Sequence, residues 1–399
     1  MYGMFYNCKA LETLNVSSFY TGKVKDMKSM FSYCKALMSL DVSNFDTGIV
    51  KDMSNMFSYC EALEELDLDN FDTEEVTDMS FMFNGCSVLT SLDLSSFNTE
   101  NVTSMGSMFA SCKNLPMLDV SSFNVESVTN MSAMFMNCES LTTIFCLDDW
   151  KEMCEAEDLN SSYMFSGCNV LKGVVPYNRN NSNDVDFANP TTGYFAPFYD
   201  LTVTEAGMAT LYLGFQAEIP EDVNAYLCYA EDLTGNKPYA LAHKFEDSYL
   251  PKETAVFVTA EPGTYRFKYY YVEPGYVINF ISDFLDGNIL TGTLEEMPVE
   301  PHSVLTLGYS NQTDDLGFWW YTGTTIPANR AYIPGDKLPA EVKGIRLLFG
   351  DDETGIKTTN LTNQTNEADA WYSIDGRKLE GKPQQRGLYI NNGKKIMVK

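Results

Sequence analysis

The chain has 399 residues, of which 44% are hydrophobic and 21% charged, a balance typical of folded protein rather than of wholesale disorder. Its 27 Lys and Arg residues stand against 55 Asp and Glu residues, so the formal net charge is −28. Such a surface repels phosphates, and we expect no nucleic acid as a partner. No apolar run approaches the ~18 residues of a membrane-spanning helix, and no signal peptide is visible at the start.

Residues 1–175 repeat a 26-residue pattern. Six cysteines recur at this interval, namely Cys8, Cys34, Cys60, Cys86, Cys112 and Cys138. Each ends a phrase of the form M-x-x-M-F-x-x-C and is followed by a leucine phrase such as LEELDL. A looser seventh copy ends at Cys168, after an insert that carries Trp150, Cys146 and Cys154. So regular a spacing predicts small units that bury their apolar sides by stacking on one another.

Each leucine phrase predicts one parallel strand, over 11–16, 37–42, 63–68, 89–94, 115–120 and 141–146. The methionine phrase has the i, i+3, i+4 spacing of a short helical turn, which Asp52, Asp78 and Asn130 are placed to cap. Stacking then predicts buried Phe, Met, Val and Cys columns. The cysteines are expected to be free thiols, because stacked Cβ bonds run parallel, and the chain has no C-x-x-C pair for zinc.

These phrases resemble the BspA-like leucine-rich repeats of bacterial surface proteins, in the class that reads M-x-x-M-F-x-x-C followed by L-x-x-L-D-[VL]-S-x-F-[DN]-T. The resemblance implies a leucine-rich-repeat solenoid over residues 1–198, with a degenerate C-terminal cap. It also implies a secreted or surface-anchored protein, since some members act as adhesins for host matrix proteins. Because solenoids need a polar terminal repeat, we expect further repeats and an export signal upstream of Met1.

The rest of the chain changes character after residue 198. Residues 199–350 are short alternating or aromatic-rich runs between turns, which predicts an antiparallel all-β domain of sandwich or jelly-roll type. Residues 351–370 read as a polar linker. Residues 371–399 form a basic β tail, which resembles the C-terminal tails of exported Bacteroidetes proteins and is interpreted either as a sorting module or as a plain β module. The predicted fold class is therefore mixed: a solenoid with one parallel strand and one helical turn per repeat, then an all-β sandwich-like domain and a small β tail.

The chemistry of an enzyme is not apparent in the sequence. The two histidines, His243 and His302, lie near no cysteine or carboxylate cluster, and the chain has no HExxH, GxSxG, P-loop or GxGxxG motif. A carboxylate pair of the glycosidase type is the alternative. We expect a non-enzymatic protein with no cofactor and no bound metal.

A column of carboxylates is the first candidate site. The fifth strand position holds Asp41, Asp67, Asp93 and Asp119, with Asn15 before them and Glu64, Glu65 and Asp69 beside them. Carboxylates ~4.8 Å apart repel by roughly 1–3.5 kcal/mol. Three interpretations stay open: Asp holds its own turn as in an Asx motif, a basic partner binds, or calcium binds. The binding candidates on this face are Asp41, Glu65, Asp67, Asp93 and Asp119.

Two adjacent tryptophans, Trp319 and Trp320, are the second candidate, within the run Phe318–Tyr321. Exposed aromatic rings can form interface anchors or stack on sugars; the alternative is that alternate members face a core. The preferred function is a surface or secreted adhesion protein that binds a host extracellular protein through the solenoid. A glycan-capture protein that uses the tryptophans and a purely structural stalk are the alternatives.

Overall fold

A computed structural model of the chain describes residues 1–181, 183–233, 238–245, 247–271, 287–309, 316–339 and 342–349, together with the backbone of four later strands. The chain forms two compact units, Met1–Phe198 and Tyr199–Lys399. The first contains the repeats, and the second contains the region of alternating sequence and the basic tail.

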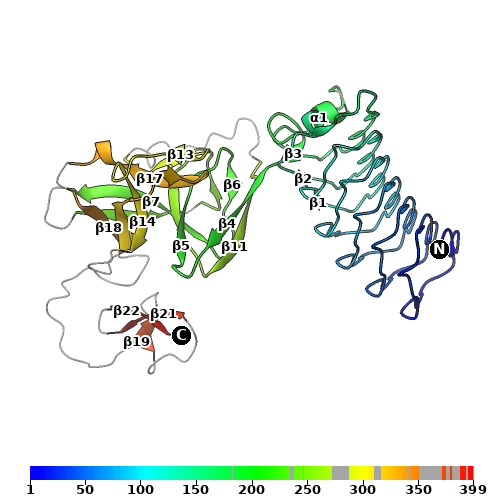
Figure 1. Cartoon of the computed structure of the whole chain (residues 1–399), viewed down its shortest axis with the longest axis horizontal. Helices are drawn as coiled ribbons and strands as arrows, with labels where there is room; N and C mark the ends of the chain where they lie inside the picture. The colour runs from blue at the N-terminus through cyan, green and yellow to red at the C-terminus, as the bar shows by residue number, and fades with distance from the viewer. Residues whose placement is uncertain are drawn as a thin grey trace. The chain divides into compact units, whose positions relative to one another are not determined.

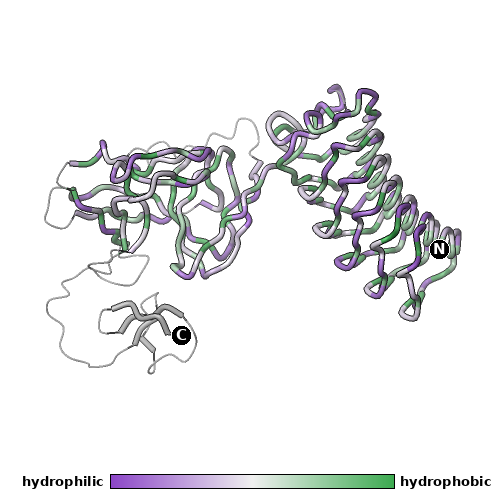
Figure 2. The backbone as a smooth tube through the Cα atoms, viewed as in Figure 1, coloured by the Kyte–Doolittle hydropathy of each residue, from purple (hydrophilic) through white to green (hydrophobic). Residues whose placement is uncertain are grey.

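Successive repeats of the first unit form coils that stack along one axis (Figure 1). Backbone bonds join each coil to the next: the N–H of Phe31 donates to the carbonyl of Met56 at 2.9 Å, and the N–H of Lys51 donates to the carbonyl of Lys25 at 2.9 Å. Hydrophilic and hydrophobic stretches alternate along each coil and recur in the next (Figure 2). One coil therefore takes one repeat, and we number coils 1 to 6 as residues 1–26, 27–52, 53–78, 79–104, 105–130 and 131–160.

The methionine phrases fold as tight turns, so the prediction of a helical turn in each repeat is wrong. In coil 2 the N–H of Met30 donates to the carbonyl of Met27 at 3.1 Å, which closes a turn. Ser29 within it has a φ of +55°, and its N–H donates to Ser54 of coil 3 at 2.9 Å instead of four residues back. Left-handed residues cannot continue a right-handed helix. The positive φ recurs at Gly3, Ser29, Asn55, Phe81, Ser107, Ala133 and Tyr163, and again at Asn7, Tyr33, Tyr59, Gly85, Ser111, Asn137 and Gly167.

The leucine phrases give only part of the predicted ladder. Regular strands form at Met117–Asp119 (β1) and Thr143–Phe145 (β2), which pair in parallel. In coils 1 and 2 the phrase contributes a single parallel bridge, between Thr13 and Ser39. A second line of parallel bridges joins Asp26, Asp52, Asp78, Ser104, Asn130 and Asn160. The predicted fold class of one strand plus one helical turn per repeat is therefore wrong, because the coils consist of turns and short parallel bridges.

The predicted core columns are confirmed. One Phe column contains Phe31, Phe57, Phe83, Phe109 and Phe135. Its rings stack on one another, with centroids 5.7 Å apart between Phe31 and Phe57 and 5.8 Å apart between Phe57 and Phe83. The Phe, Met, Val and Cys columns of coils 2 to 5 are almost fully buried. In coil 1, Phe19 is only half-buried and Cys8 is exposed. Apolar columns of this kind supply the main stabilisation of a stacked repeat.

The insert before the seventh copy extends this core. Trp150–Met153 form a short helix (α1), whose N–H groups at Lys151 and Glu152 donate to the Asp149 carboxylate. The buried ring of Trp150 stacks on that of Phe123, with centroids 6.4 Å apart. Trp150 thus continues the other Phe column, which contains Phe19, Phe45, Phe71, Phe97 and Phe123. The 3₁₀ turn Val185–Phe187 (η1) and the strand Phe195–Ala196 (β3), which pairs with β2, complete this end.

The described part of the second unit contains the following strands: β4 (Phe198–Val203), β5 (Met208–Leu211), β6 (Ala217–Glu218), β7 (Asn224–Asp232), β8 (Tyr239–Lys244), β9 (Tyr249–Leu250), β10 (Val256–Thr259), β11 (Gly263–Lys268), β12 (Thr291–Thr293), β13 (Met297–Pro298), β14 (Val304–Tyr309), β15 (Leu316–Trp320), β16 (Thr325–Ile326), β17 (Arg330–Pro334) and β18 (Gly344–Phe349), with a 3₁₀ turn at Gly335–Lys337 (η2). Nine of them form one sheet in the order β12-β17-β14-β15-β18-β8-β7-β10-β5. Strands β18 and β8 pair in parallel, whereas the other described pairs are antiparallel.

This sheet curls almost into a barrel, so the predicted antiparallel sandwich is wrong. The guanidinium of Arg330 on β17 donates to the carbonyl of Thr210 on β5 at 3.0 Å, and the N–H of Tyr212 donates to Asn329 at 3.2 Å. The two ends of the sheet therefore meet. Both faces of β10 are buried, since Phe257 lies in one core and Val256 and Val258 lie in another, shared with β4 and β11.

The C-terminal tail contains a four-stranded antiparallel sheet of order β20-β19-β21-β22, from Trp371–Ser373 (β19), Lys378–Leu379 (β20), Gly387–Asn391 (β21) and Lys394–Val398 (β22). The predicted linker, 351–370, lies outside the described residues. The sorting role of the tail stays a prediction.

Candidate functional site

The carboxylates of the acidic column each hold a turn. Oδ1 of Asp41 accepts the backbone N–H of Ser43 at 3.0 Å and its hydroxyl at 2.6 Å. The bond from the N–H two residues ahead measures 3.0 Å for Asp67, 2.9 Å for Asp93 and 3.0 Å for Asp119. This is the Asx geometry that was one of the three interpretations, and it engages one carboxylate oxygen of each residue.

Asn15 shows that the turn does not need a charge. In coil 1 the amide Oδ1 of Asn15 accepts the N–H of Ser17 at 2.9 Å, the same bond that Asp41 makes one coil later. An amide therefore holds this turn as well as a carboxylate does. The negative charge of the column is a feature separate from its turn geometry.

Two carboxylates of the column have a lowered pKa. Bonds from the Ser43 hydroxyl and then from its backbone N–H lower the pKa of Asp41. The pKa of Asp93 is lowered as well, mainly by the N–H of Ser95. Hydrogen bonds to the ionised form are the cause of both shifts. Asp41 and Asp93 therefore stay ionised at neutral and mildly acidic pH.

Coil 3 is the most acidic part of this surface. Residues 61–78 contain nine Asp and Glu residues and no Lys or Arg. Glu64, Glu65 and Asp67 are exposed on its strand side, next to one another. Two exposed methionines flank them along the stack, since Met38 in coil 2 is 54% exposed and Met117 in coil 5 is 47% exposed. The structure thus brings the candidates Asp41, Glu65, Asp67 and Asp93 to one exposed surface, and leaves Asp119 half-buried at its end.

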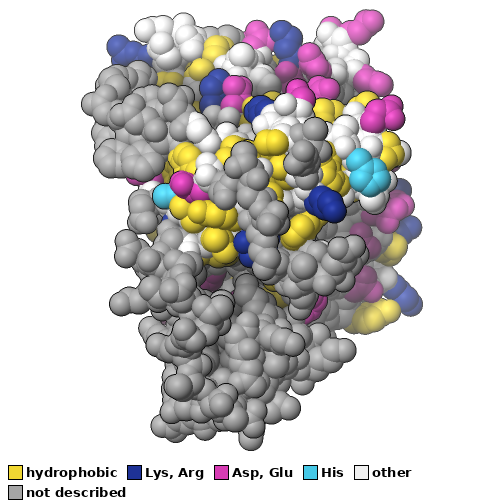
Figure 3. Space-filling view, turned by 90° about the vertical axis from the view of Figure 1, so that its left-hand side faces the viewer, with side chains coloured by type: hydrophobic (Ala, Val, Ile, Leu, Met, Phe, Trp, Pro, Cys, Tyr) yellow, Lys and Arg dark blue, Asp and Glu magenta, His cyan; other side chains and the backbone are white. Residues whose placement is uncertain are grey.

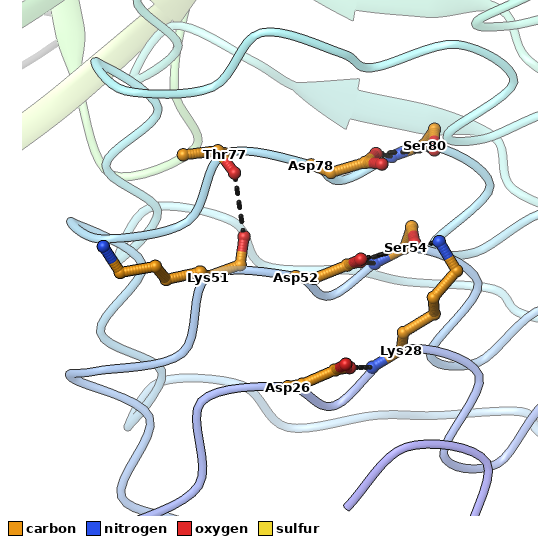
Figure 4. Close-up of polar contacts among 8 residues, drawn as sticks. All are labelled: Asp26, Lys28, Lys51, Asp52, Ser54, Thr77, Asp78 and Ser80. Carbon is orange, nitrogen blue, oxygen red and sulfur yellow. Dashed lines mark hydrogen bonds and ion pairs between the residues drawn. The ribbon is translucent and has the colours of Figure 1, made fainter.

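A second column of turn-holding residues lies elsewhere on the coil (Figure 4). Asp52 and Asp78 each accept the backbone N–H of the serine two residues ahead at 2.9 Å. Both side chains are half-buried, and Lys28 Nζ lies 3.5 Å from Asp52 Oδ2. Asp52, Asp78 and Asn130 were predicted to cap helical turns; they instead hold Asx turns, because no helix follows them in these coils.

The cysteine ladder, which consists of the cysteines that recur every 26 residues, contains mostly buried thiols of low reactivity. Each buried thiol points to a carbonyl of the preceding coil, as Cys86 Sγ does to Phe57 at 3.2 Å and Cys112 Sγ to Phe83 at 3.2 Å. Burial raises the pKa of Cys86 to about 12 and raises that of Cys112 as well. Because the thiolate is the reactive form, these groups are packing residues. Cys8 alone of the ladder is exposed.

Trp319 and Trp320 do not form one platform. Adjacent residues of a strand face opposite sides of a sheet, and Trp320 packs on the core that contains Phe318 whereas Trp319 lies against Gly344. Both rings are half-buried, and their indole N–H groups donate to Gly308 at 3.1 Å and to Val342 at 2.8 Å. Figure 3 views the chain from the side of this unit, where hydrophobic side chains gather in the middle of the described surface.

The described residues contain neither a metal-type side-chain cluster nor a membrane-spanning helix. In that part of the chain no three His, Cys, Asp or Glu side chains are grouped as a metal site would need. Nor does any described helix have the length and apolar character to cross a membrane.

Two sets of residues escaped the sequence analysis. The first set consists of buried threonines that form hydrogen bonds with the next coil, namely Thr21, Thr47, Thr73 and Thr99. A threonine two residues after a Phe recurs visibly in the sequence, but its hydrogen-bond partner lies 25 residues away. Tyr33 and Tyr59 form a stacked pair with centroids 4.6 Å apart. Their signal was the tyrosine before two successive cysteines of the ladder.

A known protein family matches the repeats of the first unit, and this match does not extend into the second unit. Residues 1–92 and 60–177 match the model of a family described as "Mycoplasma protein of unknown function, DUF285". No curated protein and no solved structure matches the chain. In its repeats, the chain is similar to this Mycoplasma family.

Proposed function

We propose that the chain is a non-enzymatic binding protein, displayed at a bacterial cell surface or secreted, whose acidic strand-side surface binds a basic protein partner. This acidic surface consists of Asp41, Glu64, Glu65, Asp67 and Asp93, with the half-buried Asp119 at its end. The likeness of the phrases to repeats of bacterial surface proteins supports the location. A host matrix protein with a basic segment is the kind of partner this location makes available.

The observation that most supports this proposal is that the turns of the Asp column do not depend on its negative charge. Asn15 makes the same turn bond as Asp41, at 2.9 Å against 3.0 Å. An uncharged residue would therefore hold the coil without adding repulsion between neighbouring coils. The column nevertheless carries a charge in four successive coils, and a cationic partner can pair with it.

The surroundings of the column fit a partner that is both basic and apolar. Met38 and Met117 flank the acidic residues of coil 3, and methionine adapts its shape to different apolar surfaces. Three coil spacings of ~4.8 Å separate these two residues. A segment with central Lys or Arg and an apolar side chain toward each end matches this arrangement.

The test compares two triple variants of the whole chain. Asp67→Asn, Asp93→Asn and Asp119→Asn remove three charges from the strand side and keep the turn acceptor, as Asn15 does. Asp26→Asn, Asp52→Asn and Asp78→Asn are the matched control, with the same charge change and the same kind of turn bond in the other column.

Binding is measured to immobilised matrix proteins and to a Lys/Arg-rich peptide with apolar ends. The proposal predicts at least tenfold weaker binding for the first variant and unchanged binding for the control. Equal loss in both would show a general charge effect. Unchanged binding in the first variant, with a lowered melting temperature, would show that the column is only structural.

A further inference from the structure

A stacked tyrosine pair lies on the turn side of coils 2 and 3. The rings of Tyr33 and Tyr59 are 4.6 Å apart and 15° from parallel, and Tyr6 of coil 1 lies edge-on to Tyr33 at 6.0 Å. The other face of Tyr59 is covered as well, because a Cβ on Gly85 would lie only 2.8 Å from its ring. The stack therefore covers ring faces, while both side chains keep part of their surface exposed.

Both tyrosines occupy a backbone conformation that disfavours them. Tyr33 has a φ of +61° and Tyr59 a φ of +57°, where a bulky residue is a rare outlier. The other coils place residues that tolerate this region better at the same position, namely Asn7, Gly85, Ser111, Asn137 and Gly167. A residue kept where its backbone is strained points to a role of its side chain.

Lysines adjoin the tyrosines in an otherwise acidic unit. Lys35 Nζ lies 5.8 Å from the centroid of Tyr59 and pairs with Glu61, and Lys9 occupies the same repeat position in coil 1, where it is exposed. Residues 1–52 contain six Lys against five Asp and Glu, whereas residues 53–198 contain four Lys and Arg against 22. The side chains of coils 1 and 2 therefore carry a formal charge of +1 in sum.

The exposed groups share one electrostatic preference. The edge of an aromatic ring is its positive part, the phenol hydroxyl donates a hydrogen bond, and the ammonium group of lysine is cationic. Glu61 is the acidic partner of Lys35, and Asp26 and Asp52 of coils 1 and 2 each accept a backbone N–H at 2.9 Å (Figure 4). The surface of Tyr6, Lys9, Tyr33, Lys35 and Tyr59 is therefore complementary to anionic oxygens.

We propose that this tyrosine–lysine surface binds an acidic polysaccharide. Its donors repeat at the coil spacing of ~4.8 Å, so a polymer that lies along the stack meets several of them at once. Sugar hydroxyls also accept hydrogen bonds from the phenol groups and donate hydrogen bonds to them. The carboxylate or sulfate oxygens pair with Lys9 and Lys35.

The experiment titrates the full chain with three sugar polymers: polygalacturonate, dextran sulfate and neutral dextran. The chain is expected to bind the first two, to bind them more weakly as salt rises, and not to bind neutral dextran. The double variant Tyr33→Gly, Tyr59→Gly keeps the fold, since Gly85 and Gly167 occupy the same repeat position farther along the chain. It should bind the anionic polymers at least tenfold more weakly, and Lys9→Gln, Lys35→Gln should do the same.

Coil 5 supplies the matched control. Ser111→Gly and Lys113→Gln alter the same two repeat positions where no tyrosine is present, and Lys113 pairs with Glu139 at 2.7 Å as Lys35 pairs with Glu61. This control should bind like the unmodified chain. The proposal is overturned if the unmodified chain binds neither anionic polymer at millimolar sugar, if neutral dextran binds equally, or if the tyrosine variant binds as before. None of these outcomes depends on the acidic strand-side surface.

Discussion

Thr47 and Asp72 are joined by two hydrogen bonds between successive coils. The Thr47 hydroxyl donates to the Asp72 carbonyl at 2.8 Å and accepts the Asp72 N–H at 2.9 Å. Thr73 makes the same pair of bonds with Asn98, at 2.7 and 2.8 Å. These threonines are 1% exposed, so water cannot replace either bond. One buried hydroxyl thus satisfies two backbone groups of the next coil.

Thr73→Val is therefore expected to lower the free energy of unfolding by about 1–3 kcal/mol, the cost of leaving buried backbone groups unpaired. Denaturant unfolding measures it. Thr103→Val is the control, because the exposed Thr103 hydroxyl makes a single bond to Thr77 at 3.1 Å, and its loss should stay within about 0.5 kcal/mol. Equal losses in the two variants would contradict the role of the buried threonines.

Ala133→Gly is expected to stabilise the chain by about 0.5–1 kcal/mol. Ala133 has a φ of +54°, where any Cβ is strained and glycine is not. Ala62→Gly, at a half-buried position without a positive φ, should destabilise by a similar amount, because glycine loses more backbone entropy on folding. A helical conformation of the methionine phrases would reverse the sign at Ala133, so this pair of thermal melts also tests the correction of the fold.

Thiol labelling should separate one cysteine from the ladder. Cys8 is exposed and should react with an aromatic disulfide reagent in the folded chain within minutes. Cys86, whose pKa burial raises to about 12, and Cys112 should react only after denaturant is added. Mass spectrometry of the labelled peptides assigns the sites. Fast labelling of Cys86 in the folded chain would show that the coils open readily.

Asp93→Asn should remove a part of the stability that depends on pH. The folded pKa of Asp93 lies below its ordinary value of 3.8, so ionisation of this group stabilises the fold above that pH. The contribution is lost as pH falls through the folded pKa. The difference in unfolding free energy between the chain and the variant should therefore shrink from pH 7 to pH 3. A difference that is constant with pH would mean that only the turn bond matters, which Asn also makes.

The buried columns of the coils could be predicted because burial follows from spacing alone. Met27, Met30, Phe31 and Cys34 recur on one side of the chain whether the phrase is a helix or two turns. The choice between these conformations depends on where the N–H groups go. The N–H of Phe31 donates to Met56 in the next coil at 2.9 Å, a partner that no local pattern reveals.

The candidate sites show the same division. Alternation along the strand predicted that Asp41 and Asp67 would be exposed, and they are. The use of one oxygen by the following N–H remained an open alternative, because it depends on the exact turn. The tryptophans were selected for being adjacent in sequence, yet adjacency in a strand puts Trp319 and Trp320 on opposite sides. A sugar platform in the second unit therefore has no support from their placement.

The measurement that tests the proposed function most directly is the rate at which the chain associates with the Lys/Arg-rich peptide, at low and at high salt. Opposite charges accelerate association, and salt screens them. The account predicts an association rate that falls at least tenfold between 20 and 500 mM salt. The strand-side variant Asp67→Asn, Asp93→Asn, Asp119→Asn should associate more slowly at low salt than the control variant in the other column. Its association rate should also change less as salt rises. Identical rates and salt dependences for the two variants would contradict it.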